Sequence, residues 1–316
     1  MRLLVFGGNG QVGTELRRAL APLGEVLATT RSGRLDDGTA CLAADFDAPD
    51  RLPALVEATA PDIVLNAAAW TAVDLAEQQP DAAFRANAHA PGALARACAT
   101  RGVPFVHYST DYVFDGSGTR PYREDDPTAP LGVYGASKLA GEDAVRAAGG
   151  TSLIFRTAWV YAEHGKNFLR TMLRVGAERD RLRVVADQIG TPTPAALIAD
   201  VTAAVVAQVM AIEPAARSGG VWHLTAAGQT SWHGFAEAIF AEASARGLLP
   251  QAPVVEAIGT ADYPTPARRP AYSCLDTRRL RSDFGLVPPD WRTALAEVMG
   301  RLADAGPAPG GSGPQG

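Results

Sequence analysis

The sequence predicts an α/β protein with a doubly wound parallel sheet and a smaller C-terminal lobe. Short runs of Val, Ile and Leu alternate with longer helical patterns over the first half of the 316 residues. Strands buried on both faces of a sheet need such continuous apolar runs. Their alternation with helices indicates βαβ units. With 47% of its residues hydrophobic, the chain can also fill a large core.

The expected elements follow one another in chain order. Apolar runs predict strands at 3–6, 26–29, 63–66, 105–109 and 152–156, and the stretches between them predict helices at 11–21, 52–59, 80–100 and 134–147. The second half is less regular, with helices expected at 167–178, 195–210, 231–245 and 291–303 and a strand at 221–225. Ser231 stands where an N-cap is needed for the third of these helices.

Charge and cysteine content exclude several classes of protein. The net charge is −5 and no basic run occurs, which argues against a nucleic-acid binder or a polybasic membrane attachment. Three scattered cysteines without metal-ligand spacing favour a reduced, cytoplasmic protein. The apolar start is too short for a signal peptide. The longest apolar stretch, 195–212, is interrupted by Asp200 and Gln208 and indicates a packed helix.

A glycine-rich turn lies directly between the first expected strand and the first expected helix. Gly7 permits a tight turn, Gly10 allows the backbone to approach a pyrophosphate, and Gly13 allows close packing of helix on strand. Gln11 and Val12 begin the helix, whose N-terminus favours bound phosphate. A plain tight turn is the alternative. The strand-to-helix context favours a Rossmann-type dinucleotide site.

The end of the second strand indicates which dinucleotide binds. A carboxylate there would bind the adenosine ribose of NAD, whereas Arg31, beside hydroxyl side chains, suits the 2′-phosphate of NADPH. NADPH is therefore favoured over NADH, unless Arg31 is a solvated loop residue. Asp45 and Phe46 are expected to flank the adenine. Later in the chain, Ala67, Ala68 and Ala69 offer small residues where a cofactor could lie close to the backbone.

A tyrosine and a lysine stand one helical turn apart, at positions 134 and 138. The chain has only two lysines, and Lys138 is one of them. On one helix face, its charge should lower the pKa of Tyr134 toward the range of a working acid or base. A solvated helix pair is the alternative. Thr110 could bind a substrate carbonyl and Asp111 a hydroxyl, although both residue types are also common in turns.

Together these motifs resemble the dTDP-4-dehydrorhamnose reductase family of extended short-chain dehydrogenase/reductases. The resemblance covers residues 1 to about 300. It is carried by the glycine loop, Asn66-Ala67-Ala68-Ala69, Ser109-Thr110-Asp111-Tyr112-Val113-Phe114, Tyr134-Gly135-Ala136-Ser137-Lys138 with Gly141-Glu142, Arg156-Thr157-Ala158-Trp159-Val160-Tyr161, Asn167-Phe168, Asp187-Gln188-Ile189-Gly190-Thr191-Pro192-Thr193 and Arg268-Arg269-Pro270.

This resemblance implies an NADPH-dependent reduction of the C4 ketone of a dTDP-linked 4-keto-6-deoxy-L-hexose. Tyr134 would donate the proton, Lys138 would hold the nicotinamide ribose, and Thr110 would take the hydroxyl role of the catalytic triad. Trp159 would face the deoxysugar ring, with a core tryptophan as the alternative. Asn167 and Arg269 are candidates for the sugar and the diphosphate. A homodimer is compatible with the family, and Glu15 could serve such an interface, but no metal is expected.

The two parts of the chain are expected to divide the work. Residues 1–165 and about 194–227 form the dinucleotide-binding domain, while about 166–193 and 228–304 form the substrate-binding lobe. The Gly- and Pro-rich residues 305–316 cannot bury a core and are expected to be a disordered tail.

Three other functions fit parts of the pattern. A 4-ketoreductase acting on another dTDP-deoxysugar shares every motif. A non-catalytic NADP-binding regulatory subunit of the same fold would bind the cofactor without turnover, which the intact Thr110, Tyr134 and Lys138 disfavour. An epimerase or dehydratase is the third possibility. A dehydratase would want an acid pair after Thr110, and the chain instead has Asp111 followed by Tyr112.

Overall fold

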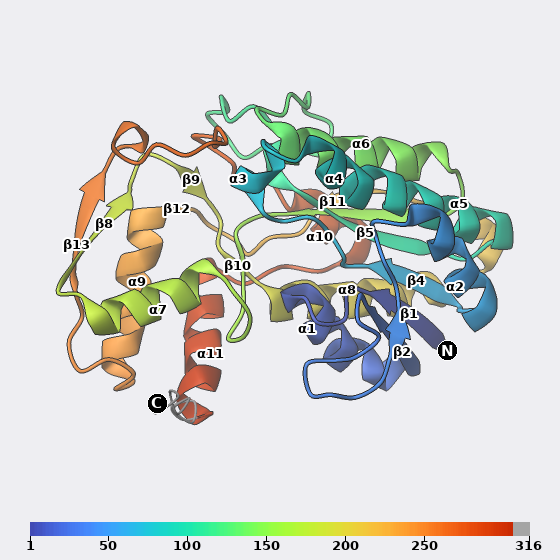
Figure 1. Cartoon of the computed structure of the whole chain (residues 1–316), viewed down its shortest axis with the longest axis horizontal. Helices are drawn as coiled ribbons and strands as arrows, with labels where there is room; N and C mark the ends of the chain where they lie inside the picture. The colour runs from blue at the N-terminus through green and yellow to red at the C-terminus, as the bar shows by residue number, and fades with distance from the viewer. Residues whose placement is uncertain (306–316) are drawn as a thin grey trace, which may run out of the picture.

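A seven-stranded sheet forms the centre of the larger part of the molecule (Figure 1). The computed structural model describes residues 1–305, so the predicted tail lies outside the described residues except for Ala305. In spatial order the strands are β11 (Gly220–His223), β6 (Ser152–Thr157), β5 (Phe105–Thr110), β4 (Ile63–Asn66), β1 (Arg2–Phe6), β2 (Glu25–Thr30) and β3 (Leu42–Ala43). Every neighbouring pair is parallel. The predicted parallel α/β fold is confirmed.

Helices cover both faces of this sheet, as the alternating side chains of β1 require. Leu3 and Val5 point toward α1 (Gln11–Leu20), α8 (Ala195–Met210) and α10 (Arg278–Phe284). Leu4 and Phe6 point the other way, toward α2 (Leu52–Thr59), α5 (Ala90–Arg101) and α6 (Val133–Ala147). Successive strand residues face opposite sides, so an uninterrupted apolar strand fills both layers.

A second, smaller part of the molecule has its own core. It is built from α7 (Phe168–Glu178), α9 (Trp232–Ala245) and α11 (Trp291–Asp304) beside the parallel pair β8 (Arg181–Val185) and β13 (Val254–Ile258). Phe235, Phe240 and Trp291 are fully buried there. In Figure 1 these elements lie to the left of the seven-stranded sheet. Among residues 1–305, no helix combines the length and apolar character that crossing a membrane requires.

The helix predicted at 80–100 is divided into three pieces, which corrects that prediction. α4 (Pro80–Phe84) is followed by a wider π-helical turn (Arg85–His89) and then by α5. Pro91 has no N–H to donate to the carbonyl of Asn87, so the regular bonding pattern cannot run through this point. That carbonyl instead lies against α6, where a side chain at Gly141 would come within 2.0 Å of it.

Several short elements were not predicted. They are α3 (Val73–Ala76), β7 (Val160–Tyr161), β8, β9 (Ile189–Gly190), β10 (Thr193–Pro194), β12 (Thr230–Ser231), β13 and α10. Most of the strands pair with segments far away in the sequence, as Val254 of β13 pairs with Arg181 of β8. Tertiary pairing creates such strands, and a local pattern cannot reveal them.

A buried ion pair links α6 to β6. Arg156 Nε and Nη2 each donate to Glu142 at 2.8 Å, and the two side chains are 4% and 0% exposed. Arg146 also donates to Glu142, at 3.1 Å. Removing one partner of such a pair leaves a buried charge uncompensated, which costs far more than an exposed pair contributes.

Arg156→Leu is therefore expected to lower the free energy of unfolding by about 3–5 kcal/mol. Denaturant unfolding measures this change. Arg174→Leu is the matched control, because Arg174 pairs with Glu178 at 3.6 Å with both side chains more than half exposed; it should change stability by less than about 1 kcal/mol. Equal effects of the two variants would contradict the importance assigned to the buried pair.

Candidate active site

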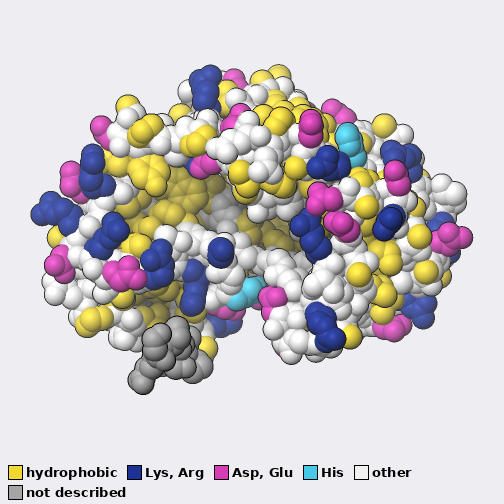
Figure 2. Space-filling view, in the orientation of Figure 1, with side chains coloured by type: hydrophobic (Ala, Val, Ile, Leu, Met, Phe, Trp, Pro, Cys, Tyr) yellow, Lys and Arg dark blue, Asp and Glu magenta, His cyan; other side chains and the backbone are white. Residues whose placement is uncertain are grey.

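A cavity of about 590 Å³ opens at the carboxyl ends of β1, β4, β5 and β6. Open α/β sheets bind their ligands at this edge. Figure 2 shows the surface hollowed between the two parts of the molecule, with hydrophobic side chains along its walls. Of the predicted site residues, the cavity brings together Gly7, Gly10, Gln11, Val12, Ala67, Ala68, Ala69, Thr110, Asp111, Tyr134, Lys138 and Trp159.

The glycine loop has the geometry that a dinucleotide-binding turn requires. Gly7 has a φ of +85°, which favours glycine, and Gly10 precedes the first turn of α1. Gly13 does not line the cavity. It packs behind the loop, where a Cβ would lie 2.0 Å from the Gly7 carbonyl oxygen. Gln11 and Val12 therefore present the helix N-terminus to the cavity, as a bound phosphate needs.

A second hollow of about 170 Å³ adjoins the glycine loop at the end of β2. Arg31, Phe46, Ala68 and Ala69 line it, as does Asp47. Asp45 does not line this hollow. Its carboxylate lies 3.5 Å from Arg31 Nε, and its place beside adenine stays a prediction. Arg31 Nη2 also donates to Asp47 at 2.9 Å. Arg31 is 72% exposed, and such an ion pair is weak enough to yield to a ligand.

Lys138 is buried, and its ammonium is held by the sheet. Its side chain is inside the molecule, with the residue only 2% exposed, and Nζ donates to the Tyr108 carbonyl oxygen at 2.5 Å. Burial lowers the pKa of Lys138 to about 8, while the charge of Glu142 opposes that change. A lysine with this pKa can exchange a proton near neutral pH.

The pKa of Tyr134 moves in the direction opposite to the prediction. Burial raises it above its ordinary value, and the hydrogen bond with the Thr110 hydroxyl only partly offsets this. Removing the phenolate from water outweighs any attraction to the ammonium, which is directed at the Tyr108 carbonyl instead. Tyr134 is consequently a protonated phenol at neutral pH, ready to act as a proton donor.

Thr110 and Asp111 form a polar pair beside Tyr134. Thr110 Oγ1 donates to Asp111 Oδ1 at 3.0 Å and accepts from the Tyr112 N–H at 3.2 Å. Burial raises the pKa of Asp111 to about 6. Its Oδ2 is buried without a hydrogen-bond partner within residues 1–305. A buried carboxylate oxygen of this kind can accept a hydroxyl from a ligand.

Trp159 lines the cavity but is not a free platform. Its indole stacks on Trp232, with ring centroids 3.5 Å apart and planes inclined by 5°. One face of the ring is therefore covered by a residue that sequence reasoning missed. Trp232 is the first residue of α9, directly after the predicted N-cap Ser231. The capping pattern predicts where the helix begins but does not indicate that Trp232 lines the cavity.

The structure places Asn167 and Arg269 outside the lining of the cavity. Asn167 caps α7 through its Oδ1, which accepts the Arg170 N–H at 3.0 Å, and its Nδ2 donates to Gln11 Oε1 at 2.8 Å. Arg269 Nη2 donates to Asp74 at 2.8 Å. Both polar groups are occupied by other parts of the chain, so direct substrate contact by either one stays a prediction.

Comparison with known proteins agrees with this geometry. The model of the family described as the RmlD substrate binding domain matches residues 1–303. A dTDP-4-dehydrorhamnose reductase from Burkholderia thailandensis is 51% identical over 300 residues, covering 93% of this chain and 97% of that protein. The Escherichia coli K12 reductase is 44% identical over 302 residues, covering 96% and 98%.

The chain belongs to the dTDP-4-dehydrorhamnose reductase family. Solved structures support the same assignment. The reductase of Bacillus anthracis in complex with NADP has a TM-score of 0.82 and 32% identity, over 95% of this chain and 99% of that one. A reductase from Clostridium acetobutylicum has a TM-score of 0.83 and 36% identity, over 96% and 99%. The resemblance inferred from the motifs is confirmed.

The smaller part of this reductase-family chain adds two cavity residues that were not predicted. Lys166 and Trp232 both line the cavity from the smaller part of the molecule. Lys166 is the second of the two lysines in the sequence. Lysine is rare in this chain, and this rarity pointed to Lys166 as much as to Lys138. It is the feature of the sequence that could have identified Lys166 as a site residue.

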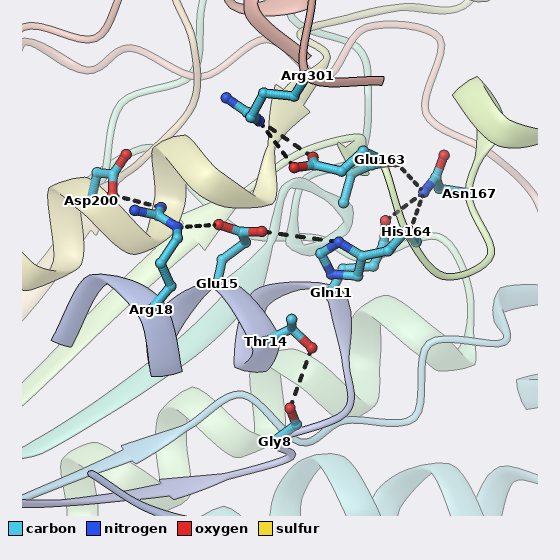
Figure 3. A network of polar contacts seen from close by, with 11 residues as sticks. Gly8, Gln11, Thr14, Glu15, Arg18, Glu163, His164, Asn167, Asp200 and Arg301 are labelled. Carbon is cyan, nitrogen blue, oxygen red and sulfur yellow. Dashed lines mark hydrogen bonds and ion pairs between the residues drawn. The ribbon is translucent and has the colours of Figure 1, made fainter. Parts of the chain in front are cut away.

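Glu15, Glu163 and His164 form a polar cluster beside the first turn of α1 (Figure 3). Their ligand atoms lie within 4.8 Å of one another, so their donor set could hold a cation. Each carboxylate already has a guanidinium partner, however: Arg18 donates to Glu15 at 2.7 Å and Arg301 to Glu163 at 2.9 Å. The cluster is thus neutralised by the chain itself.

The raised pKa of Asp111 has a measurable effect on stability. In the folded protein burial disfavours the ionised carboxylate. The stability that the protonated carboxyl contributes is therefore fully present below about pH 4 and is lost as the pH rises through about 6. Asp111→Asn removes this penalty. Relative to the unmodified protein, its free energy of unfolding should rise by up to roughly 3 kcal/mol between about pH 4 and pH 8.

Denaturant unfolding at the two pH values measures this difference. Asp143→Asn, at a carboxylate that is 65% exposed, is the control and should show little pH dependence of the difference. A pH-independent effect of Asp111→Asn would contradict the raised pKa that burial gives this carboxyl group.

Proposed function

We propose that this protein catalyses the NADPH-dependent reduction of the C4 ketone of dTDP-4-dehydro-6-deoxy-L-mannose (dTDP-4-dehydrorhamnose) to dTDP-L-rhamnose. The observation that carries this proposal is the meeting of Thr110, Tyr134 and Lys138 in one cavity with the glycine loop. Membership of the reductase family and the NADP complex of the Bacillus anthracis relative support it. The larger part of the molecule holds the cofactor, and residues 166–193 and 228–304 contribute the substrate-binding lobe.

The glycine loop, the start of α1 and Arg31 support NADPH as the cofactor. The backbone of Gly10 and the first residues of α1 face the place of the diphosphate, and Arg31 faces that of the 2′-phosphate. NADPH, when bound, supplies the hydride that reduces C4. Lys138 lies where it can bind the nicotinamide ribose while its ammonium stays fixed by the Tyr108 carbonyl.

Tyr134 completes the reaction by giving its phenolic proton to the oxygen at C4. Addition of hydride to the carbonyl carbon leaves a negative charge on that oxygen, and the O–H proton of Tyr134 converts it to a hydroxyl. The Thr110 hydroxyl, which donates to Asp111 in this structure, would turn toward the same oxygen to hold it in place. Donors positioned where charge develops stabilise the transition state most. Tyr134 is a protonated phenol at neutral pH, so its proton is in place when that charge appears.

The assay that tests this proposal supplies dTDP-4-keto-6-deoxy-L-mannose, made in place by the preceding epimerase, and follows NADPH and NADH oxidation. Product analysis should identify dTDP-L-rhamnose. Turnover of other dTDP-keto-sugars at a higher kcat/KM would identify a different dTDP-sugar 4-ketoreductase. Cofactor binding with no oxidation of either nucleotide would favour the non-catalytic regulatory subunit instead.

Localisation in the cytoplasm is part of the same proposal, supported by three cysteines that are free thiols in the structure. The partner predicted is a second copy of this chain, in a homodimer. Light scattering of the purified protein measures its oligomeric state.

Tyr134→Phe is expected to lower kcat by at least about 100-fold, because it removes the proton donor and little else. The Kd for NADPH should stay within about twofold of its original value, since the ring remains in place. Tyr122→Phe is the control: it deletes a phenol that donates to Asp115 outside the cavity. Near-full activity of Tyr134→Phe would remove this residue from the acid role.

Arg31→Ala is expected to raise the KM for NADPH about tenfold while leaving the KM for NADH nearly unchanged. The lost contact is a charge-assisted one to the 2′-phosphate, which only NADPH carries. Arg34→Ala serves as the control, because Arg34 donates to the Gly38 carbonyl and does not line the hollow at the end of β2. Equal weakening of both nucleotides would assign Arg31 a structural function only.

A further inference from the structure

The segment Glu163 to Asn167 connects β7 to α7 and lies against the first turn of α1 (Figure 3). Asn167 Nδ2 donates to Gln11 Oε1 at 2.8 Å, and His164 Nδ1 lies 3.9 Å from Glu15 Oε1. At its other end, Glu163 accepts from Arg301 of α11 at 2.9 Å. The segment is thereby fixed both to the cofactor-binding helix and to the smaller part of the molecule.

The polar groups of Asn167 hold this segment in one conformation. Besides Gln11, its Nδ2 contacts the carbonyl oxygens of Ala162 at 2.9 Å and His164 at 3.0 Å. Gly165 has a φ of +70°, and a Cβ there would lie 3.3 Å from Gln11 Cγ. The backbone therefore sits directly on Gln11, a residue that lines the cavity beside the glycine loop.

Lys166 is carried by this fixed segment and lines the same cavity. Its side chain is exposed, and its ammonium has no hydrogen bond or ion pair within the described part of the chain. Lys138, the other lysine that lines the cavity, is buried with Nζ on the Tyr108 carbonyl. Arg269 is paired with Asp74 and does not line the cavity. Among the described lining residues, Lys166 is thus the cation free to meet an anion.

We propose that Lys166 binds the diphosphate of a ligand in this cavity. The inference rests on the proposed function, in which two ligands, NADPH and a dTDP-sugar, each bring a diphosphate to the cavity. A lysine ammonium is a compact charge on a flexible side chain, and it is well suited to binding phosphate oxygens. Here the backbone that carries it is held in place by the contacts of Asn167. Lys166 reaches the ligand from the segment that lies against the first turn of α1.

The test compares Lys166→Gln with the unmodified protein by calorimetric titration of NADPH and, separately, of dTDP. Arg170→Gln is the matched control, because Arg170 is an exposed cation one turn further along α7 that does not line the cavity. Lys166→Gln should weaken binding of at least one ligand about tenfold at low salt, and the difference should shrink as salt is added. Lys166→Arg should retain most of the affinity, since it keeps the charge.

The two titrations distinguish the sources of the diphosphate. Weaker binding of NADPH alone assigns Lys166 to the cofactor, and weaker binding of dTDP alone assigns it to the substrate. Unchanged Kd values for both ligands, or equal losses in Arg170→Gln, would overturn the proposal. Because these titrations need no turnover, a protein that binds both ligands through Lys166 but leaves the keto-sugar unreduced would contradict the proposed function and not this inference.

Discussion

The active site depends on a positive charge that the fold takes out of water. Lys138 is buried at the carboxyl edge of the sheet, and the Tyr108 carbonyl accepts from its ammonium. Glu142, one turn later on α6, favours the charged form and is itself held by Arg156 from β6. A buried ammonium is costly unless it is hydrogen-bonded and compensated. The ion pair between α6 and β6 therefore also supports Lys138, which lines the cavity.

Burial has the same effect on every titratable group around this charge: it favours the neutral form. It raises the pKa of Tyr134 and Asp111 and lowers that of Lys138. In such a cavity the phenol of Tyr134 stays protonated, and Asp111 Oδ2 has no hydrogen-bond partner among residues 1–305. Ligands that carry diphosphates bring charge into a space where it is weakly screened. Lys166 lines this cavity and Arg31 lines the adjoining hollow, and both exposed side chains can reorient toward a bound phosphate.

Local chemistry explains why much of the fold could be predicted from sequence. The apolar run of β1 and the spacing of Gly7, Gly10 and Gly13 are constraints on neighbouring residues, and both were found where expected. The pairing of β8 with β13 and the π-helical turn before α5 depend on distant segments. The pKa of Tyr134 was mispredicted because its spacing from Lys138 reveals the nearby charge but not the loss of water around the phenol.

The substrate side of the cavity shows the same limit most clearly. Residue type made Asn167 and Arg269 reasonable ligands, yet Gln11 and Asp74 are their partners in the folded chain. Trp232 covers one face of Trp159, so the wall is shared between the sheet domain and α9. A few side chains from the smaller part thus complete a cavity whose proposed reacting groups all stand on the larger part. The irregular, short-stranded smaller part contributes Lys166 and Trp232 to the lining, while the larger part carries Thr110, Tyr134 and Lys138.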